Sequence, residues 1–230
     1  MTRDDIEKTR KGNLVDLRGH KNLLLSFGGI HQGLQMPVFE FFNSISDLDC
    51  DKIFLRDFHQ AWYQKGVDSE LNHIDKLIEH LREQIAINQY DKICFLGNSM
   101  GGYAAILFGT LLNVDSVISF APQTFIDRLN RWRSWDRRWT KELSSVYAFK
   151  EKRPEYFDLK NQLSTLDSYK TQINIYYSKN DRLDRYHAER LKSTRNILLH
   201  PRPEAGHDIV KQIRNSGELK ALLQSAFQSN

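Results

Sequence analysis

A serine between two glycines, in the motif Gly-Asn-Ser-Met-Gly at 97–101, is the residue of this chain best placed to act as a nucleophile. The apolar run 92–96 precedes the motif, and an apolar stretch rich in glycine and alanine, 100–112, follows it. On a turn from a strand into a helix, small residues two positions before and after a serine let the backbone bend sharply, so the hydroxyl stands clear of the sheet. The pattern predicts Ser99 as a nucleophile that attacks an acyl carbonyl. The alternative is a glycine-rich turn with an incidental serine.

A serine hydroxyl needs a general base, and the base needs an acid that orients it. Asp181 and His207 each follow a short apolar run, so each is expected in a loop just after a strand. The order serine, acid, histidine along the chain accompanies a nucleophile on this type of turn. We therefore expect Ser99, Asp181 and His207 to form a catalytic triad. Asp184 is the alternative acid, and its other role would be to cap the helix that follows.

An oxyanion formed in such a reaction needs two backbone N–H donors. One donor is expected from Met100, the residue after the nucleophile. The other is expected from the loop 27–33, where paired glycines let the backbone approach a ligand closely. We predict Gly29 as this donor, with Ile30 as the alternative and His31 as a candidate substrate contact. The same glycines would also serve a tight turn alone.

The elements that must position these residues alternate along the chain. Six short apolar runs indicate strands: 22–27, 52–56, 92–96, 114–120, 172–177 and 196–200. Amphipathic or apolar stretches indicate helices at 71–85, 100–112, 184–191 and 218–227. Near-continuous apolar strands are typical of a parallel sheet covered on both faces. We predict a three-layer α/β fold, with a mostly parallel sheet of about six strands and helices on both faces.

Together these motifs resemble the α/β-hydrolase superfamily, over residues 22–227. The resemblance implies a serine esterase or thioesterase that works through an acyl-enzyme and needs no metal or cofactor. The chain departs from the family at its N-terminal end, which is short for the β-hairpin that usually precedes the core. The segment 119–124 also resembles small hydrolase-fold proteins associated with bacterial surface-polysaccharide synthesis, some of which are acyltransferases. Gln123, within this segment, is a candidate substrate contact.

A basic, tryptophan-rich insert separates two of the predicted strands, at about 125–167. Its stretch 128–141 contains six basic residues and one acidic residue, and it holds three of the four tryptophans of the chain. Since this superfamily often carries a cap at this point, the resemblance implies a short helical cap. We interpret Trp132, Arg133 and Trp135 as candidate contacts to an anionic or sugar-bearing substrate. The aromatic and apolar residues of this stretch also recur at intervals of three or four, which predicts an amphipathic helix. The alternative is therefore that this helix packs on the core through its tryptophans, with a solvated basic face.

Composition places the chain among small globular proteins. Its 230 residues indicate a single domain, 1–230, with the insert at about 125–167. The net charge is +4 and the mean hydropathy −0.57, and no apolar run reaches the length of a membrane span. Two cysteines exclude a disulfide-rich scaffold and a zinc site built from cysteines. The sequence shows no secretory signal, so we expect a cytoplasmic protein.

The charge pattern also bears on partners. The stretch 128–141 carries a net charge of +5, more than the whole chain, so the basic excess is local. We therefore expect neither nucleic acid nor a membrane as a partner. We expect the substrate to be a small-molecule or glycan acyl ester, and the basic insert favours one that carries negative charge.

Hydrolysis of an ester or thioester is the predicted reaction. The alternatives are an O-acyltransferase or deacylase acting on a surface polysaccharide or its precursor, and an inactive binding protein on the same fold.

Overall fold

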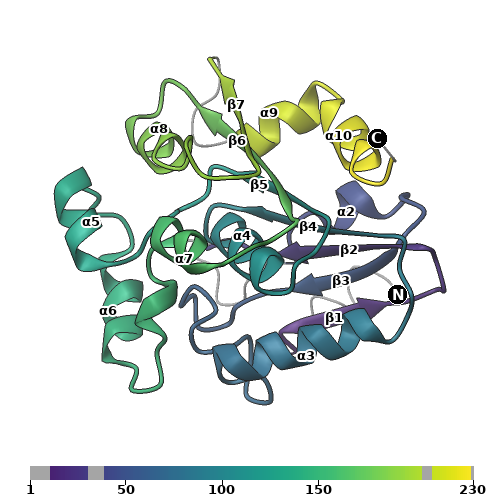
Figure 1. The fold of residues 1–230 in the computed structure, drawn as a ribbon, viewed down its shortest axis with the longest axis horizontal. Coiled ribbons are helices and arrows are strands. Elements are labelled where there is room, and N and C mark those ends of the chain that lie inside the picture. Colours follow the sequence, from purple (N-terminus) through teal and green to yellow (C-terminus); the bar gives the residue numbers. More distant parts are fainter. Residues whose placement is uncertain (1–10, 31–38, 204–208, 229–230) are drawn as a thin grey trace.

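A computed structural model of the chain describes residues 11–30, 39–203 and 209–228. Its centre is a seven-stranded sheet in the order β1-β3-β2-β4-β5-β6-β7, parallel except for β1, which pairs antiparallel with β3 (Figure 1). The strands are β1 (Asn13–Asp16), β2 (Asn22–Phe27), β3 (Asp51–Leu55), β4 (Lys92–Asn98), β5 (Ser116–Phe120), β6 (Gln172–Ser178) and β7 (Ile197–Arg202). The predicted three-layer α/β fold is confirmed. The strand that the sequence pattern missed is β1, which is four residues long and lies at the edge of the sheet.

Helices cover both faces of this sheet. The helices of the described residues are α2 (Phe42–Ile45), α3 (Ile74–Ala86), α4 (Met100–Leu111), α5 (Arg128–Ser134), α6 (Thr140–Ala148), the short 3-10 helix η1 (Pro154–Tyr156), α7 (Leu159–Thr165), α8 (Arg182–Glu189), α9 (Ile209–Asn215) and α10 (Glu218–Ser225). One face packs against α3, α4, α7 and α8, and the other against α2, α9 and α10 (Figure 1). None of the helices in the described part of the chain is long and apolar enough to cross a membrane.

The two faces of the sheet have separate apolar cores. In β2, Leu23 and Leu25 point to one core and Leu24 to the other, as expected for side chains that alternate along a strand. All three are fully buried, because helices cover both sides. This explains why the strands are continuous apolar runs in the sequence instead of alternating patterns.

The insert leaves the sheet region and returns to the same place. Phe125 and Asp158 form an antiparallel bridge, and the Ile126 N–H donates to the Phe157 oxygen at 2.7 Å. Between these ends lie α5, α6 and η1, and α7 follows directly and packs against α4. The sequence pattern predicted one amphipathic helix through this region. The structure instead breaks it at Trp135, whose φ of 55° ends α5 in a left-handed conformation.

Candidate active site

Ser99 lies on a strained turn between β4 and α4. Its φ and ψ are 54° and −114°, outside the regions that a non-glycine residue normally occupies. Such a conformation costs on the order of 1–3 kcal/mol and persists where the surroundings impose it. Here the Ser99 N–H donates to the Phe120 oxygen at 2.9 Å, and the Ser99 oxygen accepts from the Tyr103 N–H at 3.1 Å. The turn therefore has the geometry of a nucleophile elbow.

Close approach of three backbone segments requires the glycines of this motif. A Cβ on Gly97 would collide with the Gly101 oxygen, and a Cβ on Gly101 would collide with the Phe27 oxygen. A Cβ on Gly102 would lie 2.6 Å from Ser119 Oγ. The glycines thus let β4, α4 and the end of β2 meet around Ser99. The sequence motif predicted the approach of the strand and the helix, and the structure adds the end of β2.

Two backbone N–H groups near this turn are available to an oxyanion. The Met100 N–H is the first of α4, and the first N–H groups of a helix have no acceptor within the helix. The Gly29 N–H, by contrast, donates to Glu40 Oε2 at 2.9 Å. Within the described residues no acceptor faces the Ile30 N–H. The geometry therefore favours Ile30, the alternative donor, over Gly29.

Glu40 connects the loop after β2 to the residue before the nucleophile. Besides the Gly29 contact, its Oε1 accepts from Asn98 Nδ2 at 3.0 Å, and its backbone oxygen accepts from Ser26 Oγ at 2.9 Å. Burial of this carboxyl group raises its pKa to about 7. The sequence analysis missed Glu40. No spacing rule identifies a residue that acts by joining two loops, although a glutamate in an otherwise aromatic segment was a possible signal.

The two candidate acids have different roles at the start of α8. Asp181 is the N-cap: its Oδ1 accepts from the N–H groups of Leu183 and Asp184, both at 2.9 Å. Asp184 lies in the first turn and is buried, 3.5 Å from Nη1 of Arg138. The sequence analysis considered Asp184 as the cap of this helix, but the cap is Asp181. Both carboxyl groups lie just beyond the carboxyl end of β6.

His207 and His31 lie outside the described residues. The flanks of the His207 segment are described: the Lys179 N–H donates to the Arg202 oxygen at 3.1 Å, and α9 begins at Ile209. The chain therefore enters residues 204–208 at the carboxyl end of β7, beside the segment that carries Asp181. This is the edge of the sheet at which Ser99 also lies.

Gln123 is held beside the nucleophile turn. Its backbone N–H donates to the Ser99 oxygen at 3.4 Å, and its Oε1 accepts from Trp62 Nε1 at 2.9 Å. Because an indole N–H can only donate, this contact fixes which end of the amide is the oxygen. The other end, Nε2, is buried and has no partner among the described residues.

The loop after β3 holds Trp62 in place, and the sequence analysis missed this loop. The buried Asp57 carboxylate accepts from the N–H groups of His59, Ala61 and Tyr63, at 2.6 to 2.9 Å. Trp62 and Tyr63 both have positive φ, at 52° and 59°. The Tyr63 hydroxyl then donates to the Gly28 oxygen at 2.9 Å. This strained loop therefore supports both Gln123 and the loop after β2.

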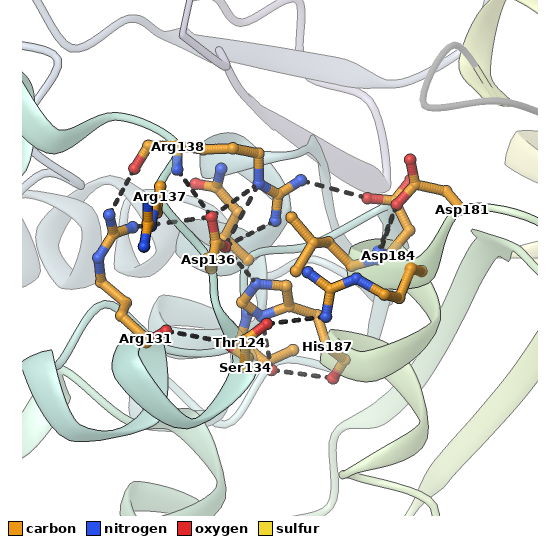
Figure 2. A network of polar contacts seen from close by, with 12 residues as sticks. Thr124, Arg131, Ser134, Asp136, Arg137, Arg138, Asp181, Asp184 and His187 are labelled. Carbon is orange, nitrogen blue, oxygen red and sulfur yellow. Dashed lines mark hydrogen bonds and ion pairs between the residues drawn. The ribbon is translucent and has the colours of Figure 1, made fainter.

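The remaining candidate contacts, Trp132, Arg133 and Trp135, lie on and just after α5. Trp132 is 75% exposed and Trp135 67% exposed. The alternative interpretation, a helix packed on the core through its tryptophans, is therefore wrong for these two residues. Ser134 and Asp136 of this segment are buried instead, and Asp136 lies between Arg138 and His187 (Figure 2).

This buried histidine is a structural residue. Nδ1 of His187 accepts from the Thr124 N–H at 3.0 Å, so the proton is on Nε2, which donates to Asp136 Oδ2 at 3.1 Å. Burial lowers the pKa of His187, whereas His187 and Arg138 lower the pKa of Asp136 against the effect of its burial. A threonine, a histidine and an aspartate meet here, as in a catalytic triad with a hydroxyl nucleophile. However, the Thr124 hydroxyl donates to the backbone oxygen of His187, and all three residues are buried. The network fixes the insert to α8.

In the described ranges, no group of three or more histidine, cysteine, aspartate or glutamate side chains could hold a metal ion. No protein-family model and no curated protein matches the chain in sequence.

Solved structures share the fold. The capsule O-acetyltransferase of Neisseria meningitidis serogroup A matches with a TM-score of 0.70 and 20% identity, over 92% of this chain and 90% of that one. For the fluorophosphonate-binding serine hydrolase F of Staphylococcus aureus the TM-score is 0.61 and the identity 15%, over 93% and 86%. An esterase from Thermogutta terrifontis matches at 0.55 and 15%, over 95% and 90%. With its sheet order, its elbow and these likenesses, the chain has the α/β-hydrolase fold.

Proposed function

We propose that the chain is a serine enzyme that cleaves an acyl ester or thioester through an acyl-enzyme. The observation that carries this proposal is the strained backbone of Ser99, at φ 54°, directly before the first N–H of α4. The Ile30 N–H, in the loop after β2, has no acceptor among the described residues. A strained non-glycine turn supports a functional role for the residue on it. The likeness to hydrolases, esterases and an acetyltransferase supports the same reaction class.

In the proposed mechanism, Ser99 Oγ attacks the acyl carbonyl while His207 takes the hydroxyl proton. The Met100 and Ile30 N–H groups stabilise the tetrahedral oxyanion. Collapse breaks the bond to the leaving alcohol or thiol, which receives the proton from His207. Water then attacks the acyl-serine, His207 takes a proton from it, and the acid leaves with Ser99 restored.

The acid that orients His207 is Asp181 in this proposal, with Asp184 as the alternative. Asp181 lies at the strand end and has one oxygen fixed by two N–H groups, whereas Asp184 is the more buried of the two. Asn variants discriminate between them. The true acid loses on the order of 10³–10⁴ in kcat, as expected when the imidazole is no longer held in the right tautomer. If neither variant loses activity, the triad is wrong.

A second candidate acceptor is a sugar hydroxyl in place of water. The observation that favours it is the likeness, at a TM-score of 0.70, to a capsule O-acetyltransferase, which has also been solved in complex with CoA. An acetyl thioester is incubated with the enzyme, with and without a glycan acceptor. Acetylated glycan at the expense of free acetate supports transfer, whereas free acetate at an unchanged rate supports hydrolysis.

A further inference from the structure

Exposed apolar side chains lie along α5 and on the residue that ends it, on a surface that we call the tryptophan face. Leu129, Trp132 and Trp135 follow one another at intervals of three residues and are 54%, 75% and 67% exposed. The other exposed large apolar residues in the described part of the chain are Ile87, Leu198 and Tyr186, at 57%, 56% and 39%. Exposed tryptophans grouped on one face are typical of an interaction surface.

This face is held rigidly. Ser134 and Asp136, on the inner side, are buried, and Arg182 Nη1 donates to the Ser134 oxygen at 2.8 Å. Asp136 is fixed by Arg138 and His187 (Figure 2). The tryptophans are therefore displayed by an anchored segment and are not exposed because the segment is loosely packed.

A groove of about 690 Å³ runs from this face between α5, η1 and α7. Leu129 and Arg133 line it, so the groove and the tryptophan face are continuous through these two residues. Its other polar lining includes Asn130, Lys160 and Gln162. Gln162 is 4% exposed, and within the described residues neither its Oε1 nor its Nε2 has a hydrogen-bond partner. A buried amide with both ends unpaired is unusual unless a ligand or water meets it.

The groove lies apart from the nucleophile. Leu111, which lines it, is the last residue of α4, whereas Ser99 directly precedes the first. A helix of 12 residues is about 18 Å long. The groove is therefore a second site, outside the elbow, on the same side of the sheet.

Charge indicates what this site holds. Arg128, Arg133 and Arg137 are exposed along this segment, and Asp136, the single acidic residue in 128–141, is buried. The groove itself is balanced, since Arg133, Lys160 and Arg190 line it together with three acidic residues. Apolar ring faces, amide groups and arginine forks suit a sugar chain with carboxylate or phosphate groups.

We propose that the surface formed by Leu129, Trp132, Arg133, Trp135 and Gln162 binds an anionic glycan chain. Sugar rings lie against the tryptophans, Arg133 pairs with the acidic group, and the Gln162 amide bonds a hydroxyl or acetamido group once the chain enters the groove. The proposal does not depend on acyl chemistry at Ser99, because binding is measured without turnover.

Binding of the full chain is measured by affinity electrophoresis and tryptophan fluorescence with polygalacturonate, with poly(glycerol phosphate) and with neutral dextran. We expect retention by at least one anionic polymer and none by dextran, and the two anionic arms distinguish a carboxylate from a phosphate ligand. Trp132→Ala and Arg133→Ala are expected to raise Kd at least tenfold. Ile87→Ala and Arg214→Ala, the matched controls on other exposed surfaces, leave Kd unchanged.

Gln162→Leu separates a binding role from a packing role. If Gln162 contacts the glycan, this variant binds less tightly while its unfolding midpoint is unchanged or higher, because an unpaired buried amide has been removed. Unaltered binding by the variants of Trp132, Arg133 and Gln162 overturns the proposal. So does a result in which neither anionic polymer retains the protein.

Discussion

At the scale of single residues, the position of the loop after β2 depends on the hydrogen bonds of the Glu40 carboxylate. Glu40 joins Gly29 to Asn98 and so fixes the loop after β2 against the residue that precedes Ser99. It also accepts from the Gly29 N–H, so in the proposed mechanism the Ile30 N–H is the one that stabilises the oxyanion. In this account Glu40 positions the oxyanion donors without touching the substrate.

Glu40→Gln tests this role. A glutamine has one acceptor oxygen, so its NH₂ group must face either the Gly29 N–H or the Asn98 amide, and one contact is lost. Removal of an oxyanion donor costs about 10²–10³ in kcat, so displacement of the loop is expected to lower kcat by about tenfold or more. KM should change little. Glu151→Gln, at an exposed position, is the control, and equal kcat in both variants contradicts the role.

The same carboxyl group makes a pH-dependent contribution to stability. Its pKa is about 7 in the folded protein and near 4.5 when unfolded, so the folded state binds more protons between these values. Its contribution therefore becomes less favourable as the pH rises from 4.5 to about 7. Urea unfolding at several pH values should show Glu40→Gln gaining stability relative to the wild type across this window. A pH-independent difference would mean that Glu40 is ionised in both states.

At the scale of elements, the insert is fixed by a buried polar network. Its members come from the strand-end segment 121–127, from the link between α5 and α6, and from α8 (Figure 2). The sequence pattern predicted a helix through this link because aromatic residues recur at helical intervals. The structure breaks the helix because Asp136 turns inside the protein, where it pairs with the nearby Arg138 and with His187, which lies 51 positions further along the chain. Local periodicity carries no information on such a partner.

Asp136→Asn should destabilise the fold by about 3 kcal/mol, because removing one partner of a buried ionic network leaves the others uncompensated. The free energy of unfolding in urea at pH 7.5 measures this loss, and Glu151→Gln serves as the exposed control. A loss no larger than that of the control would mean that the network contributes nothing.

The network also predicts sensitivity to acid. The folded pKa values of His187 and Asp136 are both lowered. The contribution of His187 is therefore lost as the pH falls below its ordinary value of 6.5, and that of Asp136 as the pH falls below 3.8. In the window between pH 6.5 and 5, His187→Gln should lose less stability than the wild type. An identical loss in both proteins would contradict a neutral, buried His187.

At the scale of the whole molecule, the fold was readable because its strands are buried on both faces. All six predicted strands are present within a few residues, and the predicted turn at Ser99 is present because Gly97 and Gly101 are sterically required around it. Glu40, Gln162 and the loop after β3 could not be located in the same way. They act through contacts between segments that are distant in the chain, and a single sequence does not record those contacts.

The structure also changes the role that we assign to the basic segment of the chain. The basic excess lies in 128–141, where the acidic residue is buried while three of the arginines and two of the tryptophans are exposed. The sequence analysis assigned this segment to contacts with the substrate. The structure places it beside a groove that begins at the far end of α4 from the nucleophile. Chemistry and recognition of a polymer are thus proposed for two separate places on one chain.

The central claim, that Ser99 is an activated nucleophile, is tested most directly by labelling with a fluorophosphonate probe. Wild-type protein and Ser99→Ala are treated at neutral pH, and the site of the adduct is mapped by mass spectrometry, with circular dichroism confirming that both proteins are folded. The account predicts one adduct, on Ser99 in the wild type, and none in the variant. Equal labelling of both proteins, or an adduct on another residue, would contradict it.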